Sequence, residues 1–300
     1  MMHTDRGADT RVQRVDPSTG CVELAEFIDV GQDLVYTVHH LPPSSRAGHS
    51  LVMCSPFFAE FPRNYRREVL VARRLAERGV AVTRFHHRGV GNSTGDAALM
   101  GLDRLIEDAR RVAAVAAETS GAHSLAFHGT RLAGFTAAAA AIGAQMPVSL
   151  WEPVVRGSKY FNEVLRTRMV QAVHDGETDV SAGSLRHELT SGAPVDVLGH
   201  SLHPELYTSL HDQTLDELLG PPAREILVVE FGRKRKDVGR MIERALEQGL
   251  TATLAVSTES ESWWVANRRA DYFVAEERRQ LTGEVVRTMD AWFEKLGWTA

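Results

Sequence analysis

The apolar and polar residues of this chain follow two successive patterns. Over residues 21–28 and 33–40 they alternate, which predicts an antiparallel hairpin that ends at the prolines of positions 42 and 43. From residue 50 onward, short apolar runs alternate with longer segments of helical periodicity, which predicts an α/β fold with a doubly wound, mostly parallel sheet. We expect strands at 50–55, 80–85, 124–128, 147–151, 225–231 and 252–256, and helices at 65–78, 102–119, 132–144, 236–248 and 276–296.

The alternation of strands and helices stops between residues 156 and 220. Amphipathic pieces at 160–174 and 204–219 are separated there by polar, glycine-containing loops, and no run of strand character occurs. This pattern predicts a helical lid inserted after the sixth strand. The expected organisation is a flexible N-terminal arm at 1–20, a core at 21–155 and 221–300, and the lid at 156–220.

The segment 124–134, SLAFHGTRLAG, carries the strongest chemical signal. A short apolar strand leads into a tight turn and then into an alanine-rich helix, which is the setting of the G-x-S-x-G nucleophile elbow. The small residues at 129, 133 and 134 allow such a turn to close. Arg131 stands at the position where the nucleophile of an elbow would be.

With three further motifs, the chain resembles the α/β-hydrolase superfamily. SLVMCS (50–55) resembles its third strand, PFFAE (56–60) its oxyanion loop and HHRGVGNS (86–93) its R-G-x-G-x-S turn. More narrowly, the chain resembles the exosortase A system-associated hydrolase family of the second type, which also carries arginine in its elbow. The motifs of that narrower resemblance are SPFFAE, NYRR (64–67), GTRLAG and LWEPVVRGSKYFNEVLR (150–166). The resemblance is strong over residues 50–173 and rests elsewhere on element order. It implies an α/β-hydrolase fold and a role in polysaccharide or secondary-metabolite assembly.

A Ser-His-Asp hydrolase needs a hydroxyl at the elbow, an acid after strand six or seven, and a histidine after strand eight. Arg131 stays protonated at physiological pH, so it can neither attack a carbonyl nor accept a proton. The last histidine of the sequence is His211, which precedes strand seven. Asp237 and Glu152 are candidate acids, but neither has a histidine to orient. We therefore expect a non-standard active site.

Arg131 has two interpretations. In the first, it forms a salt bridge with Glu152 at the exit of the neighbouring strand, because a partly buried guanidinium is costly unless its donors are satisfied. In the second, its planar fork holds a substrate carboxylate or phosphate. Both hold if Glu152 orients Arg131 for a ligand. Glu60, in the oxyanion loop, is either a general base or a solvated loop residue. Arg131, Glu152 and Glu60 are the expected catalytic residues.

Several neighbours of the elbow are expected to line a substrate pocket. Thr130 and Ser55 are hydroxyls that either substitute as nucleophile or hydrogen-bond the backbone of a turn. Cys54 is a nucleophile or, as the end of an apolar strand, a core residue. The expected substrate-binding residues are Phe57, Phe58, Thr130, His86, Trp263 and Trp264. His86 and His87 lack a third ligand at a recognised interval, so we expect no metal, and no motif calls for a cofactor.

Composition limits the partners and the location. With 300 residues, 43% hydrophobic and 24% charged, the chain can bury one large core or a core plus a lid. A net charge of −5 gives no overall attraction to nucleic acid or to an anionic membrane. The basic run 233–236 is a solvated face or a guide for an acidic substrate or partner. No apolar segment is long enough to span a bilayer. The two cysteines, Cys21 and Cys54, indicate a reducing compartment, so a cytoplasmic location is expected.

Three functions follow from these observations. The first is an α/β-hydrolase-fold enzyme with altered machinery that acts on a small acyl, ester or thioester substrate. The second is a non-hydrolytic enzyme, such as an isomerase, epimerase or cyclase, in which Arg131 fixes an anion and Glu60 or Glu152 moves a proton. The third is a catalytically silent protein that binds a ligand or partner in the same cleft. The sequence leaves the substrate and the oligomeric state open.

Overall fold

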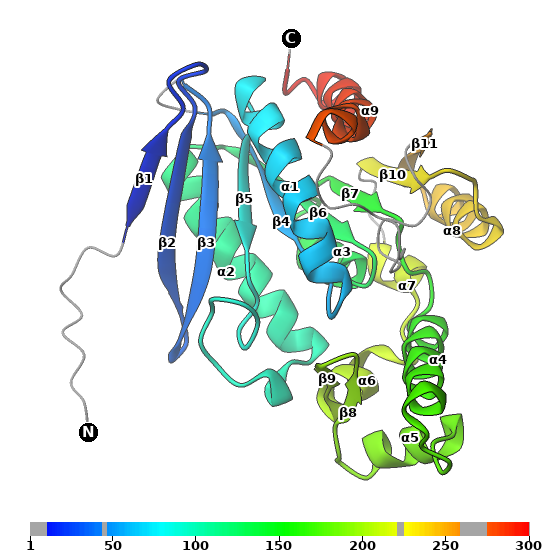
Figure 1. Cartoon of the computed structure of the whole chain (residues 1–300). Helices are drawn as coiled ribbons and strands as arrows, with labels where there is room; N and C mark the ends of the chain where they lie inside the picture. The colour runs from blue at the N-terminus through cyan, green and yellow to red at the C-terminus, as the bar shows by residue number, and fades with distance from the viewer. Residues whose placement is uncertain (1–10, 44–46, 221–224, 259–274, 300) are drawn as a thin grey trace, which may run out of the picture.

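A single nine-stranded sheet forms the centre of the computed structural model, which describes residues 11–43, 47–220, 225–258 and 275–299. The strand order is β1-β2-β3-β5-β4-β6-β7-β10-β11 (Figure 1). The first three strands pair antiparallel and β3 pairs antiparallel with β5, whereas all pairs from β5 to β11 are parallel. The strands are β1 (Val12–Val15), β2 (Val22–Val30), β3 (Asp33–Leu41), β4 (His49–Cys54), β5 (Ala81–Phe85), β6 (Ser124–Thr130), β7 (Val148–Trp151), β10 (Glu225–Phe231) and β11 (Thr251–Ser257). The predicted doubly wound, mostly parallel sheet is confirmed.

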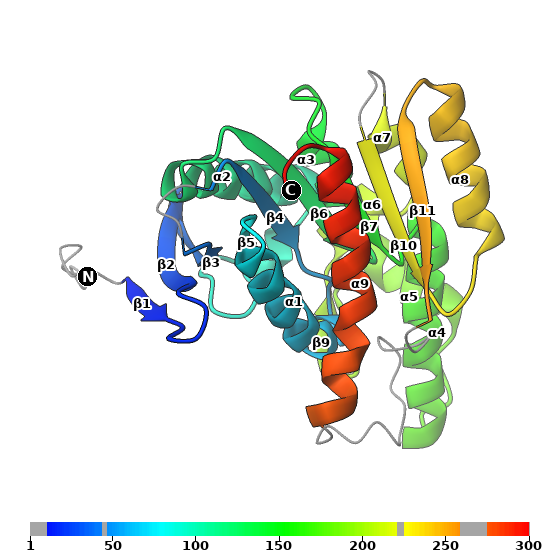
Figure 2. The ribbon, with the colours of Figure 1, turned by 90° about the horizontal axis from the view of Figure 1, so that it is seen from above.

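Helices cover both faces of this sheet (Figure 2). The core on one face includes side chains of α1 (Glu60–Glu77) and α9 (Ala275–Lys295). The core on the other face includes side chains of α2 (Leu102–Ser120), α3 (Ala133–Ala141) and α8 (Lys236–Glu247). All nine residues of α3 are buried, which explains why this helix is built almost entirely from alanine and other small residues.

Two of the predicted boundaries are wrong in an informative way. Helix α1 begins at Glu60, five residues earlier than expected. Pro62 does not prevent this start, because it lies in the first turn of the helix, where a missing N–H is tolerated. In the expected flexible arm, residues 12–15 form β1, which pairs with β2 although all four of its residues are exposed. The short 3-10 helix η1 (Ala97–Leu99) precedes α2.

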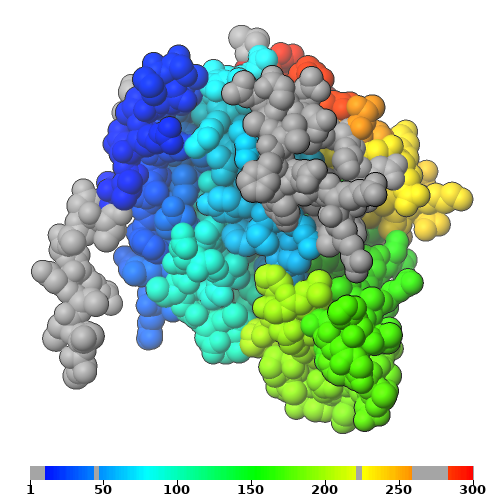
Figure 3. Space-filling view, viewed as in Figure 1, coloured from blue at the N-terminus to red at the C-terminus, as the bar shows by residue number. Residues whose placement is uncertain are grey.

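Most of the segment between β7 and β10 forms a lobe at one end of the sheet (green to yellow-green at the lower right of Figure 3). It contains α4 (Gly157–Asp175), α5 (Ala182–Thr190), α6 (Pro204–Leu210) and α7 (Leu215–Leu219). The expectation that it holds no strand is wrong in detail, because β8 (Val195–Val197) and β9 (His200–Leu202) form a small antiparallel hairpin. Neither strand joins the main sheet. We call residues 156–220 the insertion.

Among the helices of the described residues, none combines the length and the apolar character needed to cross a membrane.

Candidate functional site

The turn between β6 and α3 has the geometry of a nucleophile elbow. Arg131 has a φ of 55°, a left-handed conformation that is unfavourable for a residue with a side chain. The turn closes tightly, since a Cβ on Gly129 would lie 2.6 Å from the carbonyl oxygen of Ala133. The backbone N–H of Arg131 donates to the Trp151 carbonyl at 3.0 Å, which ties the elbow to the end of β7. The chain therefore keeps a strained elbow and presents an arginine on it.

Arg131 is only 6% exposed, and its side chain meets groups from three different elements. Its Nε donates to Oε1 of Glu60, the first residue of α1, at 3.0 Å. Its Nη1 donates to the backbone carbonyl of Glu152 at 3.5 Å. From the insertion helix α4, Glu163 Oε2 lies 3.7 Å from Nη2, and the Tyr160 ring centroid lies 5.8 Å from the guanidinium carbon. The arginine thus connects the core of the molecule to the insertion.

The predicted salt bridge between Arg131 and the Glu152 carboxylate is wrong. Glu152 has a φ of 43°, and its side chain turns away from the elbow. One carboxylate oxygen accepts the Phe231 N–H at 2.6 Å, and the other lies 3.5 Å from Nε of Arg235. Only the carbonyl of Glu152 faces Arg131, so Glu60 takes the place that the sequence assigned to Glu152.

Glu60 is held at the elbow by two polar groups. In addition to Arg131, the Tyr160 hydroxyl donates to Oε2 of Glu60 at 3.4 Å. Burial raises the pKa of the Glu60 carboxyl, an effect that the neighbouring Arg131 charge only partly offsets. Burial likewise disfavours the charged form of Arg131, but Glu60 outweighs it and the arginine pKa is raised. The pair is therefore a fixed guanidinium beside a carboxyl group that is less acidic than usual.

A second guanidinium, that of Arg235, contacts the Glu152 carboxylate and was missed by sequence reasoning. Arg235 Nε donates to Glu230 Oε1 at 3.0 Å, and its Nη2 donates to the Pro153 carbonyl at 2.5 Å. Together with the Glu152 contact, these bonds fix the loop that leaves β7. The signal in the sequence is the basic run 233–236, for which a solvated face or an electrostatic guide is the expectation. One of its four residues instead forms a structural ion pair.

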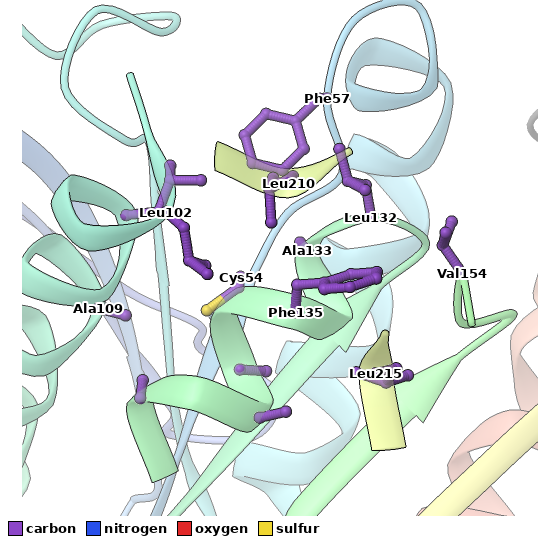
Figure 4. Packing of buried hydrophobic residues seen from close by; sticks show 14 of the residues in the cluster. Cys54, Phe57, Leu102, Ala109, Leu132, Ala133, Phe135, Val154, Leu210 and Leu215 are labelled. Carbon is purple, nitrogen blue, oxygen red and sulfur yellow. The ribbon is translucent and has the colours of Figure 1, made fainter. Parts of the chain in front are cut away.

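The expected substrate-binding residues that the structure describes, Phe57, Phe58, Thr130 and His86, have different surroundings. Phe57 is buried in the same apolar cluster as Leu132 and Leu210, at the junction of core and insertion (Figure 4). Phe58 is partly buried against that cluster and has a φ of 53°. Thr130 is fully buried, with its hydroxyl 2.9 Å from Nε2 of His128.

His86 faces a different environment. Its ring lies against the rings of Tyr36, Phe61 and Tyr65, and its Nδ1 accepts the Asn92 N–H at 3.0 Å. Burial lowers its pKa to about 4, so the ring is neutral at physiological pH. These contacts place the His86 ring in a cluster of aromatic side chains. Trp263 and Trp264 lie outside the described residues.

The alternative nucleophiles are also accounted for. Ser55 donates to Oε2 of Glu68 at 2.6 Å, and Nδ2 of Asn64 donates to the other oxygen of that carboxyl at 2.5 Å. Burial raises the pKa of Glu68 to about 7. Cys54 is fully buried, and burial raises the pKa of its thiol, which makes it a core residue rather than a nucleophile. Within the described part of the chain, no three His, Cys, Asp or Glu side chains could together hold a metal ion.

The comparisons with known proteins identify the fold. No family model matches the chain, and no curated protein matches its sequence. Solved structures do match. DcsB in complex with a substrate analogue has a TM-score of 0.59 at 12% identity, covering 90% of this chain and 98% of DcsB. Est1E from Butyrivibrio proteoclasticus with bound ferulic acid has a TM-score of 0.57 at 12% identity, covering 89% of this chain and 100% of Est1E.

A third match is XC6422 from Xanthomonas campestris, described as a member of the α/β serine hydrolases without a lid. Its TM-score is 0.52 at 17% identity, and the alignment covers 93% of this chain and 97% of XC6422. At such identities the likeness establishes the fold alone. The strand order of the sheet, the elbow between β6 and α3 and the matching solved structures all indicate the same fold. The chain therefore has the α/β-hydrolase fold.

Proposed function

We propose that this chain is an α/β-hydrolase-fold enzyme with a non-standard active site, in which Glu60 transfers a proton and Arg131 holds an anionic, small acyl substrate. The observation that carries this proposal is the hydrogen bond of 3.0 Å between Arg131 Nε and Glu60 Oε1 at a strained elbow. A buried carboxyl whose pKa is raised by burial is suited to accept and donate a proton. Its orientation is set by Arg131 on one oxygen and Tyr160 on the other.

The position of Glu60 favours proton transfer over hydrolysis. In a serine hydrolase, the loop after the third strand helps to stabilise the negative charge of a tetrahedral intermediate. Here that loop, which follows β4, leads into α1, whose first residue is Glu60. An ionised carboxylate at this place repels an oxyanion, so an acyl-transfer intermediate is disfavoured. Isomerisation, epimerisation or cyclisation of an acyl compound fits the same groups better.

The remaining hydroxyls support this preference. Thr130 is fully buried and its hydroxyl lies beside His128, while Ser55 donates to Glu68. Neither hydroxyl shares a hydrogen bond with Glu60 or Arg131 among the described residues. The two cysteines are free thiols, which supports the cytoplasm as the location. The narrower exosortase-associated resemblance supports a role in polysaccharide or secondary-metabolite assembly.

A catalytically silent binding protein is the second candidate. This candidate is favoured because the positive charge of Arg131 already lies next to two carboxylates of the same chain, those of Glu60 and Glu163. In such a protein the arginine would hold the insertion in place, and a ligand would bind without being converted.

The two candidates are separated by following proton exchange. Purified protein is incubated in D2O with short-chain carboxylic acids and acyl thioesters that carry a proton next to the carbonyl, and deuterium uptake is measured by mass spectrometry. We expect uptake into at least one compound, and loss of this uptake in Glu60→Gln. Glu77→Gln is the matched control on the same helix, where Glu77 pairs with Arg74 near the surface. Binding without uptake would favour the silent protein.

Ester hydrolysis gives the complementary test. Turnover of p-nitrophenyl acetate or butyrate is expected to stay near background, and a fluorophosphonate probe is expected to leave the protein unlabelled. Hydrolysis at a rate typical of esterases, lost on Thr130→Ala, would show that a hydroxyl serves as nucleophile and would refute the proposal.

A further inference from the structure

The buried acid of the core, Glu60, has a hydrogen-bond partner that comes from the insertion. Tyr160 of α4 is only 3% exposed, and its hydroxyl lies 3.4 Å from Oε2 of Glu60. The other oxygen of the same carboxyl, Oε1, accepts from Nε of Arg131 at 3.0 Å. The two oxygens of Glu60 therefore face different partners, one on the elbow and one on the insertion.

These two partners differ in what they can do for a proton. A guanidinium carries donors and no acceptor, so Arg131 can only donate to Oε1. A phenol hydroxyl can donate or accept. Burial raises the pKa of the Tyr160 phenol well above its ordinary value, so the hydroxyl stays protonated. Of the two partners, only Tyr160 can bond to Glu60 both as a carboxylate and as a carboxylic acid.

This difference decides which oxygen of Glu60 carries a proton. In a carboxylic acid, the oxygen that bears the proton is a weaker acceptor than the carbonyl oxygen. A proton on Oε1 would therefore weaken the charge-assisted bond from Arg131, whereas a proton on Oε2 can be donated to the Tyr160 oxygen. The arrangement directs protonation to Oε2, on the side of the insertion.

We propose that Tyr160 is a positioning residue that keeps the exchangeable proton of Glu60 on Oε2, so that the docked insertion completes the acid-base group of the core. This inference rests on the proposed function, since it names the oxygen through which Glu60 exchanges a proton with its substrate. Removal of a proton from carbon forms the Oε2–H bond and leaves the electron pair of the C–H bond on the substrate. The return step reverses both changes.

The start of α4 is fixed firmly enough to hold Tyr160 in place. The N–H of Gly157 donates to the Gln213 carbonyl at 3.0 Å, and a Cβ on Gly157 would overlap the Leu210 carbonyl oxygen. Three residues further on, Tyr160 lies in the same buried apolar cluster as Phe57. The position of its hydroxyl therefore depends on packing of the insertion against the core.

The groups around Glu60 give the direction of the expected change. Among the described residues, the charge of Arg131 favours the ionised form of Glu60, and the charge of Glu163 favours the protonated form. Glu163 lies on Arg131 rather than on Oε2, and 59% of its side chain is exposed. The Tyr160 hydroxyl favours the ionised form, because a hydrogen bond to a carboxylate is stronger than one to a neutral acid. Loss of this hydroxyl should therefore raise the pKa of Glu60.

The test follows Glu60 by NMR in protein whose glutamate carboxyl carbons are isotope-labelled, and its signal is assigned by its loss in Glu60→Gln. We expect Tyr160→Phe to move the midpoint of the Glu60 titration upward by about 0.5–1 pH unit. Tyr207→Phe is the matched control, because it removes a hydroxyl from α6 of the insertion, where the Tyr207 ring packs against Phe161. It should leave the midpoint unchanged.

A second measurement uses the unmodified protein and does not depend on how a variant folds. The ring carbon that bears the Tyr160 hydroxyl should change its NMR shift with the same midpoint as Glu60, because the hydroxyl changes from donor to acceptor. This change should disappear in Glu60→Gln. Where the deuterium-exchange assay detects uptake, its pH profile should move upward in Tyr160→Phe together with the Glu60 midpoint.

Three results would overturn the inference. They are a Glu60 midpoint that is unchanged or lower in Tyr160→Phe, an equal rise in Tyr207→Phe, and a Tyr160 ring signal that does not follow the Glu60 titration. Failure of the proposed function has a different signature, because the midpoint would then move as described while no compound exchanged its proton through Glu60.

Discussion

Two arginines with the same exposure stand at the carboxyl edge of the sheet and have different surroundings. Arg88 follows β5 and Arg131 follows β6, and each is 6% exposed. Arg88 donates from Nε to Asp108 and from Nη2 to Glu107, both at 2.5 Å, and its backbone N–H donates to Asp108 at 3.0 Å. The corresponding side-chain distances at Arg131 are 3.0, 3.5 and 3.7 Å.

The origin of the partners explains the difference. Both acidic partners of Arg88 come from α2, so folding of one helix onto the sheet completes that cluster. Among the described residues, partners of Arg131 come from α1, from the end of β7 and from α4 of the insertion. A saturated arginine bound by one element supports the fold. An arginine on a strained turn, shared between three elements, is placed where ligand binding or movement of the insertion changes its contacts.

The largest expected effect is the loss of the Arg88 cluster. Arg88→Met leaves the buried Asp108 carboxylate with His87 as its remaining side-chain partner, and breaking a buried ion pair costs about 3–5 kcal/mol of unfolding free energy. Urea denaturation at pH 7 measures this cost. Arg111→Met is the control on α2, the helix that carries the acidic partners of Arg88. Among the described residues Arg111 donates to the Asp29 carbonyl near the surface, and the cost of its loss should stay below about 1 kcal/mol. Equal costs for the two variants would contradict the structural role of Arg88.

Glu68 extends the comparison to a buried carboxyl whose hydrogen-bond donors, Ser55 and Asn64, are neutral. Its pKa is raised to about 7, so between the ordinary glutamate value of 4.5 and pH 7 the folded protein binds a proton that the unfolded chain has lost. The contribution of Glu68 to the unfolding free energy is therefore fully present below pH 4.5 and is lost as the pH rises through 7. The measured quantity is the unfolding free energy of Glu68→Gln minus that of the unmodified protein. This difference should be about 3 kcal/mol larger at pH 8 than at pH 4.

The measurement for Glu68 is the difference in unfolding free energy between the two proteins from pH 4 to pH 8. Glutamine can keep both hydrogen bonds, because the Asn64 amide and the Ser55 hydroxyl can each act as donor or acceptor. A pH-independent difference would show that Glu68 is ionised in the folded protein throughout this range.

Arg131→Met should have a smaller effect than Arg88→Met. Glu60, left without its arginine, can take up a proton because burial already raises its pKa. The expected loss is about 1–2 kcal/mol at pH 7, well below the cost of stranding a charge that must stay ionised. In the double variant with Glu60→Gln, part of the loss should be recovered as a coupling energy of about 1 kcal/mol. Additive effects would indicate that the two side chains do not interact in solution.

Much of the scaffold could be predicted from the sequence because its signals are local. The strand at 225–231 was predicted with its exact bounds, and the elbow was recognised from small residues at fixed spacing. β1 was missed, since four exposed residues provide no apolar alternation. The small hairpin of β8 and β9 was missed because its strands are three residues long.

The partners of Arg131 could be predicted only in part, because they depend on local backbone conformation and on how a helix docks on the core. Neither leaves a pattern in the sequence. Glu152 and Glu60 were both expected near the elbow, and the backbone conformation of Glu152, with a φ of 43°, sends its carboxylate to Phe231 instead. Tyr160 and Glu163 belong to α4, which packs on the core through buried apolar side chains, such as Phe161, that lie in the same cluster as Phe57. No local pattern in α4 indicates that docking.

The smallest expected effect concerns the exposed ion pair between Lys159 of α4 and Asp237 of α8. Its distance of 3.1 Å is close to that of Arg131 to Glu60, but 60% of the Lys159 side chain is exposed. Water and salt screen such a pair, and fixing a long lysine costs side-chain entropy. Lys159→Met should therefore change the unfolding free energy by less than about 0.5 kcal/mol, measured by urea denaturation at low and high salt. The insertion is held instead by buried apolar side chains and by backbone bonds such as Leu215 N–H to the Val155 carbonyl, at 2.9 Å. A salt-sensitive loss above 1.5 kcal/mol would mean that this ion pair, rather than packing, keeps α4 in place over Arg131.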